Sequence, residues 1–478
     1  EKRLLRILLM INILIPVNKN VTPLYKYYTV FLSKITKNLS EENINVTLLL
    51  FSDLLVENFK SHTLINGDSG SISNKLINEL EREFNFSFKQ ILYVDLMQTS
   101  KFINNTMWRN WYLPDVEFSE SKIHKNKLNQ IVDLFDNNNF SYVFTDQTPD
   151  FEQSFIMHLC KKKNIPFIRY LPNFMDRGYF NHYKTNGSVK TIETQLSKID
   201  NNEIKKFIEE YRNGQSSSIY SLHTDYTLYK SKKSIVKKII DNRLIDIYSF
   251  IRTKIKSLYY NKIESLLKNI YYSKFKKDTD YIYYGLALTV ESHVALQSYP
   301  FINQINVIET ISRSLPHGYI LYVKPHPWWS STMSLKYIRQ ISKMPSVKIL
   351  DPNHKIKSIL RNSKGIVTLN STSGIESLVL GNGAIALAEL NSYAEFHPNA
   401  SYCNNLYKLP EMIVKMVNNK VENIDTENYM LKMFEISSDV PFEADRFLSD
   451  IDANDKANKF AIYIQLIIKN YFKNNSLI

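Results

Sequence analysis

The chain has 478 residues, which is too long for one hydrophobic core, and its 44% hydrophobic content is enough to fill two. Its two cysteines, Cys160 and Cys403, lie far apart without metal-ligand spacing, which argues against a disulfide framework or structural zinc site and favours a reducing, cytosolic setting. The net charge of +13 indicates an anionic partner, but does not choose between nucleic acid, lipid headgroups, nucleotides and acidic glycans.

The opening segment, EKRLLRILLMINILIP, has the basic start and apolar run of a signal peptide. We expect a strand instead, because Arg6 and Asn12 interrupt the run and no small-residue cleavage site follows. No other stretch approaches transmembrane length, so any membrane contact is expected to be peripheral.

Apolar runs and helical patterns alternate over the first third of the chain, which predicts a parallel α/β domain. The expected strands are 5–16, 45–51, 90–96, 140–146 and 165–171, with helices over about 23–39 and 151–163. Ligands of such sheets lie beyond the carboxyl ends of the strands, which points to Asp146 and to residues 172–177. Asp146, Asp176 and Glu152 are therefore candidate catalytic carboxylates, whereas Asp150 is expected to cap a helix.

The middle of the chain, residues 198–278, is helical in pattern and rich in Lys, Ile and Tyr, as in YKSKKSIVKKIIDNRL. Basic amphipathic helices of this kind fit a surface that meets anionic lipid or a polyanionic substrate. A solvated face of a connecting helical segment explains the pattern equally well. No aromatic RNA-binding signature accompanies it, so we expect no nucleic acid partner.

The α/β pattern then resumes. Strands are expected at 281–288, 319–325, 346–351, 365–370 and 383–389, with helices such as 303–315 and 353–362 between them. Two α/β domains joined by a helical stretch resemble the two Rossmann-like halves of a GT-B glycosyltransferase, which face a cleft. The expected domains are 1–197 (acceptor side), 198–278 (basic helical segment), 279–405 (nucleotide-sugar binding) and 406–478 (helices that pack back on the domains).

The segment IVTLNSTSGIESLVLGN predicts a strand, a polar turn and a helix. Ser373 and Glu376 have the S-x-x-E spacing of a capping box. The free N–H groups at such a helix start can hold an anion, and the hydroxyls of Ser371, Thr372 and Ser373 would add donors. Helix capping by Ser373 without any ligand is the simpler interpretation of this segment alone.

A second motif, YVKPHPWW, places Lys324 and His326 just past a strand of the same predicted sheet. Both motifs would then lie at the carboxyl edge of one sheet. A cation and a histidine beside a hydroxyl-rich helix start predict a site for a phosphate monoester or diphosphate, without a metal.

Three segments, in order, resemble motifs of the capsule polysaccharide biosynthesis proteins, a family that includes retaining β-Kdo transferases using CMP-Kdo. They are TVESHVALQSYPFINQ, YVKPHP and LNSTSGIESLVLGN, and the resemblance covers about residues 281–400. Glu291, followed by Ser292, stands where the family usually has Asp. The resemblance implies that His326, Ser371 and Thr372 contact the nucleotide phosphate. It also implies that Glu376 reaches toward the ribose or holds the turn.

These observations predict a cytosolic GT-B glycosyltransferase of surface polysaccharide synthesis, peripheral at the inner face of the membrane. Its donor would be CMP-Kdo or a similar nucleotide sugar, its acceptor a glycan or glycolipid, and no cofactor would be tightly bound. The candidate catalytic residues are His326, Asp146, Asp176 and Glu291, and the candidate donor-binding residues are Lys324, His326, Asn370, Ser371, Thr372, Ser373, Gly374 and Glu376.

Three other functions stay open at this stage. A CDP-glycerol-type polyol-phosphate transferase would need a second histidine, for which His293 and His397 are the candidates. A nucleotide-sugar epimerase would need no acceptor and no basic helical segment. A non-catalytic polyanion-binding protein would act through residues 198–278.

Overall fold

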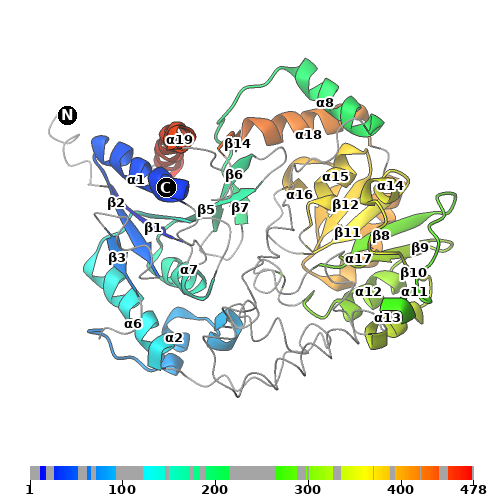
Figure 1. Ribbon diagram of the computed structural model, residues 1–478, viewed down its shortest axis with the longest axis horizontal. Helices are drawn as coiled ribbons and strands as arrows, with labels where there is room; N and C mark the ends of the chain where they lie inside the picture. Colours follow the sequence, from blue (N-terminus) through cyan, green and yellow to red (C-terminus); the bar gives the residue numbers. More distant parts are fainter. Residues whose placement is uncertain are drawn as a thin grey trace, which may run out of the picture. The chain divides into compact units, whose positions relative to one another are not determined.

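The computed structural model divides into two compact units, each described here by itself (Figure 1). Unit 1 comprises Glu1–Asp95, Glu117–Ile204 and Tyr429–Ile478, and unit 2 comprises Leu96–Val116 and Lys205–Asn428. The residues described are 11–17, 26–51, 62–65, 71–92, 122–145, 150–172, 177–183, 189–214, 265–287, 298, 301–326, 335–369, 371–387, 393–419, 421–440 and 450–475.

Unit 1 is built on a sheet with the order β14-β6-β5-β4-β1-β2-β3, in which β7 pairs with β6. Its strands are β1 (Ile11–Pro16), β2 (Ile44–Leu50), β3 (His62–Leu64), β4 (Tyr142–Thr145), β5 (Phe167–Pro172), β6 (Gly178–Tyr183), β7 (Val189–Thr191) and β14 (Ser437–Ser438). The run β3-β2-β1-β4-β5 is parallel, and β6, β7 and β14 add antiparallel strands at one side. The chain order reverses between β1 and β4, which defines a doubly wound sheet.

Helices cover both faces of this sheet (Figure 1). They are α1 (Lys26–Glu41), α2 (Ile77–Phe84), α6 (Lys122–Asn137), α7 (Phe151–Lys163) and α19 (Asp450–Asn475). On one face α1 and α19 bury an apolar cluster that includes Leu32, Ile464 and Phe144. On the other, α2 and α7 meet through an edge-to-face pair of Phe84 and Phe155. The C-terminal helix is thus part of the core of the N-terminal sheet.

Arg177 ties the returning chain to unit 1. Its guanidinium donates to Ser197 Oγ (2.7 Å) and to the Ser437 carbonyl (3.0 Å), and lies 4.0 Å from the centre of the Phe434 ring. Phe434 ends helix α18 (Asn423–Glu435) next to β14. Arg177, at the end of the range 172–177 that the sequence pointed to, is therefore covered by the returning chain.

Unit 2 contains a six-stranded sheet with the order β10-β9-β8-β11-β12-β13. Its strands are β8 (Tyr281–Gly285), β9 (Ile320–Lys324), β10 (Val347–Ile349), β11 (Gly365–Thr368), β12 (Gly383–Ala386) and β13 (Ala400–Tyr402). Every neighbouring pair is parallel. Numbered by chain order this is 3-2-1-4-5-6, the Rossmann order, and it reverses between β8 and β11.

One face of this sheet packs against helices α12 (Gln304–Arg313), α13 (Leu335–Ser342) and α17 (Leu409–Asn418), through Ile308, Ile338 and Ile413. The remaining helices are α8 (Asn201–Asn213), α11 (Ser265–Asn269), α14 (Ile356–Leu360), α15 (Ser373–Val379), α16 (Tyr393–Phe396) and a 3-10 turn at Leu406–Lys408. Tyr281, on β8, donates to the Ile359 carbonyl of α14 (2.5 Å). Because side chains alternate between the two faces of a strand, every second residue of β8 points toward the face that carries α14.

The predicted α/β class with two Rossmann-like parallel sheets is confirmed.

One predicted strand, at residues 90–96, is wrong. Residues 88–92 are helical, and Ile91 N donates to the Ser87 carbonyl (3.1 Å) while Gln90 N approaches Ser87 Oγ (3.4 Å). A short apolar run fits either state, and a serine three residues before a glutamine favours a helix start. The third parallel strand is β3, which the sequence did not reveal.

Other differences concern connections and the middle of the chain. The hairpin β6–β7 and the strands β13 and β14 were not predicted, since each is short or bends back on a neighbour. Of the predicted helical segment 198–278, α8 and α11 are described, whereas 215–264 lies outside the described residues. The domain boundaries at 197, 278 and 405 stay predictions. In the described part of the chain no helix has the length and apolar character to cross a bilayer.

Candidate functional site

The carboxyl ends of β9 and β11 carry the two motifs that the sequence singled out. Both strands neighbour β8 in the parallel sheet, so their ends lie at one edge, about 10 Å apart at the usual strand spacing. Lys324 is the last residue of β9, and Ser371 follows β11 by three residues. The reversal of strand order beside β8 makes this edge the place where open α/β sheets bind their ligands.

Lys324 is a largely buried cation at this edge, with 8% of its surface exposed. Burial lowers its pKa to about 8, partly opposed by the carboxylate of Asp351. Its carbonyl accepts from Leu286 N (3.0 Å), which extends the β8–β9 pairing beyond Gly285. His326 follows two residues later and is half-buried. The backbone of Lys324 is therefore fixed at the end of the sheet.

The turn between β11 and α15 is organised by Ser371. Its N–H donates to Thr368 Oγ1 (3.0 Å), and its Oγ accepts from Ser373 N (3.3 Å) and Ser373 Oγ (2.7 Å). Ser371 is half-buried, Thr372 is exposed and Ser373 is buried with 2% exposed. Ser371 and Thr372 thus reach the surface of the turn, while the Ser373 hydroxyl is engaged within it.

The predicted capping box is wrong. Helix α15 begins at Ser373 with Thr372 as its N-cap, and the Thr372 side chain makes no capping hydrogen bond. Glu376 instead accepts a hydrogen bond from Tyr211 Oη (2.7 Å). The S-x-x-E spacing considers local partners alone, and here a buried tyrosine from a distant helix takes the carboxylate.

Glu376 is a buried carboxylate held between two helices. Burial raises its pKa, while the hydrogen bond from Tyr211 and the charge of Lys357 oppose the rise. The Lys357 ammonium lies 3.9 Å from the centre of the Tyr211 ring. Next to Tyr211, Arg212 donates to the Val379 carbonyl at the end of α15 (2.9 Å). Helix α8 therefore holds α15 at both ends.

Tyr211 is a residue of this site that the sequence analysis missed. Ile204, Ile208 and Tyr211 form an apolar stripe on α8 at spacings of four and three residues, and all three are buried. The stripe predicts a buried face, but nothing in it identifies the partner of the hydroxyl.

Gln304 fixes the chain where it leaves β8. Its Oε1 accepts from Ala287 N (2.8 Å) and from Tyr284 Oη (3.0 Å), and its Nε2 donates to the Ala287 carbonyl (2.8 Å). This clamp fixes the backbone at Ala287, two residues after β8 ends. Glu291 and Asn370 themselves lie outside the described residues.

Among the predicted carboxylates of unit 1, Asp146 and Asp176 also lie outside the described residues. The expected capping role of Asp150 is confirmed, since its Oδ1 accepts from Gln153 N at the start of α7 (2.8 Å). Glu152 is 1% exposed and pairs with Lys127 Nζ (2.6 Å), which holds it in an ion pair rather than at a free surface.

A buried polar row in the sheet of unit 1 was also missed. Thr145, Arg169 and Asn181 are paired in register across β4, β5 and β6, with 5%, 2% and 0% of their surfaces exposed. Thr145 Oγ1 donates to Gln153 Oε1 (2.7 Å). The arginine within the otherwise apolar strand FIRYLP was a signal for this row, because buried arginines are rare.

His397, a candidate for the polyol-phosphate transferase, is not at the ligand edge. It precedes β13, at the amino edge of the sheet, and is 3% exposed. Its Nδ1 accepts from Asn399 N (3.1 Å), and burial lowers its pKa to about 4, partly opposed by Asp425. A neutral histidine at the opposite edge cannot be the second catalytic histidine. His293 lies outside the described residues.

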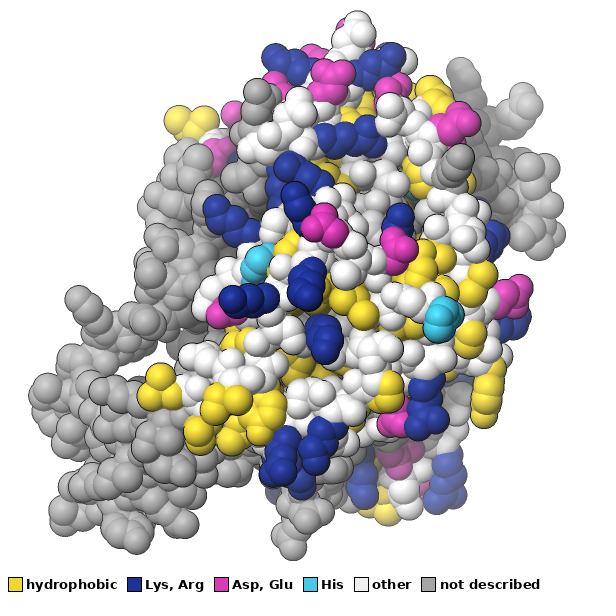
Figure 2. Space-filling view, turned by 90° about the vertical axis from the view of Figure 1, so that its right-hand side faces the viewer, with side chains coloured by type: hydrophobic (Ala, Val, Ile, Leu, Met, Phe, Trp, Pro, Cys, Tyr) yellow, Lys and Arg dark blue, Asp and Glu magenta, His cyan; other side chains and the backbone are white. Residues whose placement is uncertain are grey.

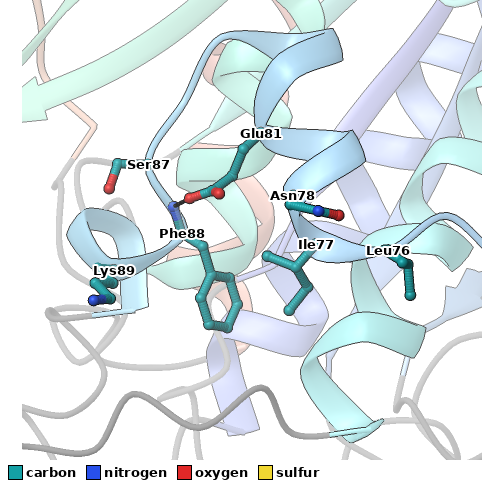
Figure 3. Close-up of a pocket in the computed structure, with 7 residues that line it drawn as sticks. All are labelled: Leu76, Ile77, Asn78, Glu81, Ser87, Phe88 and Lys89. Carbon is teal, nitrogen blue, oxygen red and sulfur yellow. Dashed lines mark hydrogen bonds between the residues drawn. The ribbon is translucent and has the colours of Figure 1, made fainter.

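A surface pocket of about 350 Å³ lies in unit 1, between α2 and the following helical turn (Figure 3). Glu81, one of its lining residues, accepts from Phe88 N (2.7 Å). The pocket contains none of the predicted site residues. Across the described residues, no group of three or more His, Cys, Asp or Glu side chains is placed to hold a metal ion.

Unit 2 thus has a Rossmann-ordered parallel sheet with a lysine, a histidine and hydroxyls at its switch-point edge, which is where open α/β sheets bind ligands. Residues 202–389 match the family model described as capsule polysaccharide biosynthesis protein. This segment of the chain is similar to that family, so the resemblance drawn from the motifs is confirmed. The match also extends to α8, which holds Tyr211.

Similar solved structures include the β-Kdo 2,4 transferase of Thermosulfurimonas dismutans KpsC, at 12% identity and a TM-score of 0.33, covering 62% of this chain and 79% of that one. The β-Kdo 2,7 transferase of the same KpsC gives 10% identity and a TM-score of 0.29, with 64% and 79% covered. The UDP-GlcNAc 2-epimerase of Methanocaldococcus jannaschii gives 14% identity and 0.24, with 88% and 98% covered. A search of curated proteins found no match.

Proposed function

We propose that this chain is a glycosyltransferase of surface polysaccharide synthesis that binds the nucleotide part of its donor at the edge of the unit 2 sheet. The observation that carries the proposal is the placement of Lys324 and His326 at the same edge as the Ser371–Thr372 turn. Both motifs lie within the segment that matches the capsule polysaccharide biosynthesis family.

The chemistry follows from where charge develops. When the bond between sugar and nucleotide breaks, negative charge grows on the phosphate oxygen, and a preorganised donor aimed at it contributes about 3 kcal/mol. Lys324, His326 and the Ser371 and Thr372 hydroxyls supply such donors without a metal. The group that faces the sugar or activates the acceptor hydroxyl is proposed among Asp146, Asp176 and Glu291.

The donor sugar, the acceptor, the membrane contact and the roles of the turn residues are each proposed on a separate observation. The three motifs that resemble the capsule polysaccharide biosynthesis proteins are the support for a CMP-sugar, with Kdo or a similar acid as the sugar, and for a glycan or glycolipid as acceptor. The +13 net charge supports peripheral contact with the inner face of an anionic membrane. Ser373 and Gly374 are proposed to shape the turn, and Glu376, which accepts from Tyr211, to hold it rather than bind ribose.

Titration with CMP, CDP, UDP and GDP by calorimetry tests the nucleotide site. We expect CMP to bind best and Ser371→Ala to weaken it roughly tenfold, because a hydrogen bond to a charged group is worth about 1.5–3 kcal/mol. Ser358→Ala, at an exposed position on α14, is the control and should bind as the wild type does. Preference for CDP would favour the polyol-phosphate transferase and preference for UDP the epimerase. A chain that binds no nucleotide would refute the site.

The affinity for CMP should depend on pH through Lys324. Its ammonium form attracts phosphate, and its pKa of about 8 means that the free protein loses this charge as the pH rises above that value. We therefore expect affinity to be constant between pH 6.5 and 7.5 and to fall above pH 8, by up to tenfold per pH unit. In Lys324→Met the affinity should be lower at pH 7 and flat up to pH 9. A wild-type affinity that stays constant to pH 9 would contradict this role.

A further inference from the structure

Helix α11 has its polarity inverted relative to an ordinary surface helix. Lys268 is buried, with 1% exposed, while Leu266 and Ile270 are 69% and 76% exposed and Leu267 is 42% exposed. A surface helix normally turns its lysines outward and its leucines toward the core. The outward apolar group therefore needs an explanation outside the core of unit 2.

The sheet fixes the chain that follows this apolar group. Tyr272 forms a parallel bridge with Ile349 of β10, and Ser273 N donates to the Ile349 carbonyl (2.7 Å). Tyr271 and Tyr272 pack against the apolar core of the unit. Leu266, Leu267 and Ile270 are thus presented next to an anchored segment.

The surroundings of the apolar group are cationic. Residues 265–277 contain four lysines and no acid, and residues 335–348, which include the neighbouring helix α13, contain four Lys or Arg and no acid. Of these, the side chains of Lys274, Lys276, Lys277, Lys336, Arg339, Lys343 and Lys348 are exposed. Figure 1 shows α11 and α13 side by side, and Figure 2, which views this side of the molecule, shows hydrophobic side chains together with Lys and Arg side chains on the lower part of the face.

We propose that α11 and the basic residues beside it form a docking surface for an anionic phospholipid bilayer. Leu266, Leu267 and Ile270 would enter the boundary between headgroups and acyl chains, and the lysines would meet the anionic headgroups. An acidic protein partner would be attracted by the same charge, but it would not need three apolar side chains held out into solvent. This surface goes beyond the nucleotide site, because it says which residues would bring the protein to its membrane-borne acceptor.

Vesicle flotation of the full chain tests the proposal. We expect binding to vesicles of equal parts phosphatidylglycerol and phosphatidylcholine, weak binding to pure phosphatidylcholine, and loss of binding as salt rises from 50 to 500 mM. The double variant Leu266→Asp/Ile270→Asp and the double variant Lys274→Glu/Lys277→Glu should each lower binding at least tenfold. Matched controls are Ile451→Asp on α19, at 75% exposure, and Lys161→Glu/Lys162→Glu on α7.

A second measurement is independent of whether the aspartate variants fold. The native cysteines Cys160 and Cys403 are buried, so an environment-sensitive fluorophore attached at Ile270→Cys reports on this position alone. Its emission should shift to the blue with anionic vesicles, while the same label at Tyr407→Cys, 96% exposed, should not respond. Absence of vesicle binding, equal binding to neutral vesicles, or unchanged binding of both double variants would overturn the proposal. CMP binding measured on the same samples keeps this result separate from the nucleotide site.

Discussion

Replacement of His326 by alanine should lower the rate of sugar transfer by 10²- to 10³-fold. This is the loss seen when one preorganised donor is removed from a developing negative charge, about 3–4 kcal/mol. His326 follows Lys324 at the carboxyl edge of β9, where the phosphate of the donor is proposed to lie. The measurement is release of free nucleotide from CMP-Kdo in the presence of a glycan acceptor. Because the donor acts on charge that develops in the transition state, the loss should fall mainly on kcat.

The matched control is His317→Ala. His317 is exposed and precedes the same strand at its amino end, so it offers the same side chain at the opposite edge of the sheet. Its rate should stay within twofold of the wild type. If His326→Ala keeps at least a third of the wild-type rate while His317→Ala does the same, His326 has no part in the transfer.

The strands and helices that repeat a simple pattern could be predicted from the sequence. Helix α7 begins and ends at the predicted residues, Phe151 and Lys163, because an Asp precedes it and three lysines close it. The strands of unit 2 are continuous apolar runs between polar turns, so their order along the chain was clear as well. The order of these strands within the sheet could not be predicted, because strand pairing depends on contacts between segments far apart in the sequence.

The candidate site shows the same limit. The positions of Lys324 and Ser371 at the ends of β9 and β11 follow from local pattern, and so does their meeting at one edge once the sheet is parallel. The burial that lowers the pKa of Lys324 could not be predicted from local pattern, because it depends on how the neighbouring strands and helices cover the side chain. Likewise, Ser371 rather than Ser373 organises the turn, because Thr368 in the preceding strand offers its hydroxyl as acceptor.

Glu376 illustrates a misleading local signal. Its spacing from Ser373 fits a capping box, and the family resemblance allows it to reach the ribose. In the structure Glu376 is 9% exposed, and its carboxylate accepts a hydrogen bond from Tyr211, which lies 165 residues away in the sequence. A contact over such a separation leaves no trace in one sequence, so it could be found only in the folded chain.

Tyr211→Phe should destabilise unit 2 by about 2 kcal/mol at pH 8, which is the usual value of a hydrogen bond to a charged group. The change keeps the buried ring under the Lys357 ammonium and removes only the hydroxyl that Glu376 accepts. Glu376 already has a pKa raised by burial, and without the hydroxyl its pKa should rise further. Urea unfolding of wild type and variant at pH 8 and pH 5 measures the difference. Tyr211→Ala should cost more, about 3–5 kcal/mol, because it also leaves a cavity.

The destabilisation caused by Tyr211→Phe should depend on pH. An acid whose pKa is raised in the folded state makes stability fall as pH increases from its unfolded pKa to its folded pKa, because the folded protein then holds protons that the unfolded chain has released. Since Tyr211→Phe raises that folded pKa further, its cost should be largest where Glu376 is ionised and should become smaller as the pH falls and Glu376 takes up a proton, because the neutral acid no longer needs the donor. Tyr284→Phe is the control, because Tyr284, on strand β8 of the same unit, is as fully buried as Tyr211 but donates to the neutral Gln304. It should cost about 1 kcal/mol at both pH values. A cost of Tyr211→Phe that does not change with pH would mean that Glu376 is not the charged partner that helix α8 holds in place.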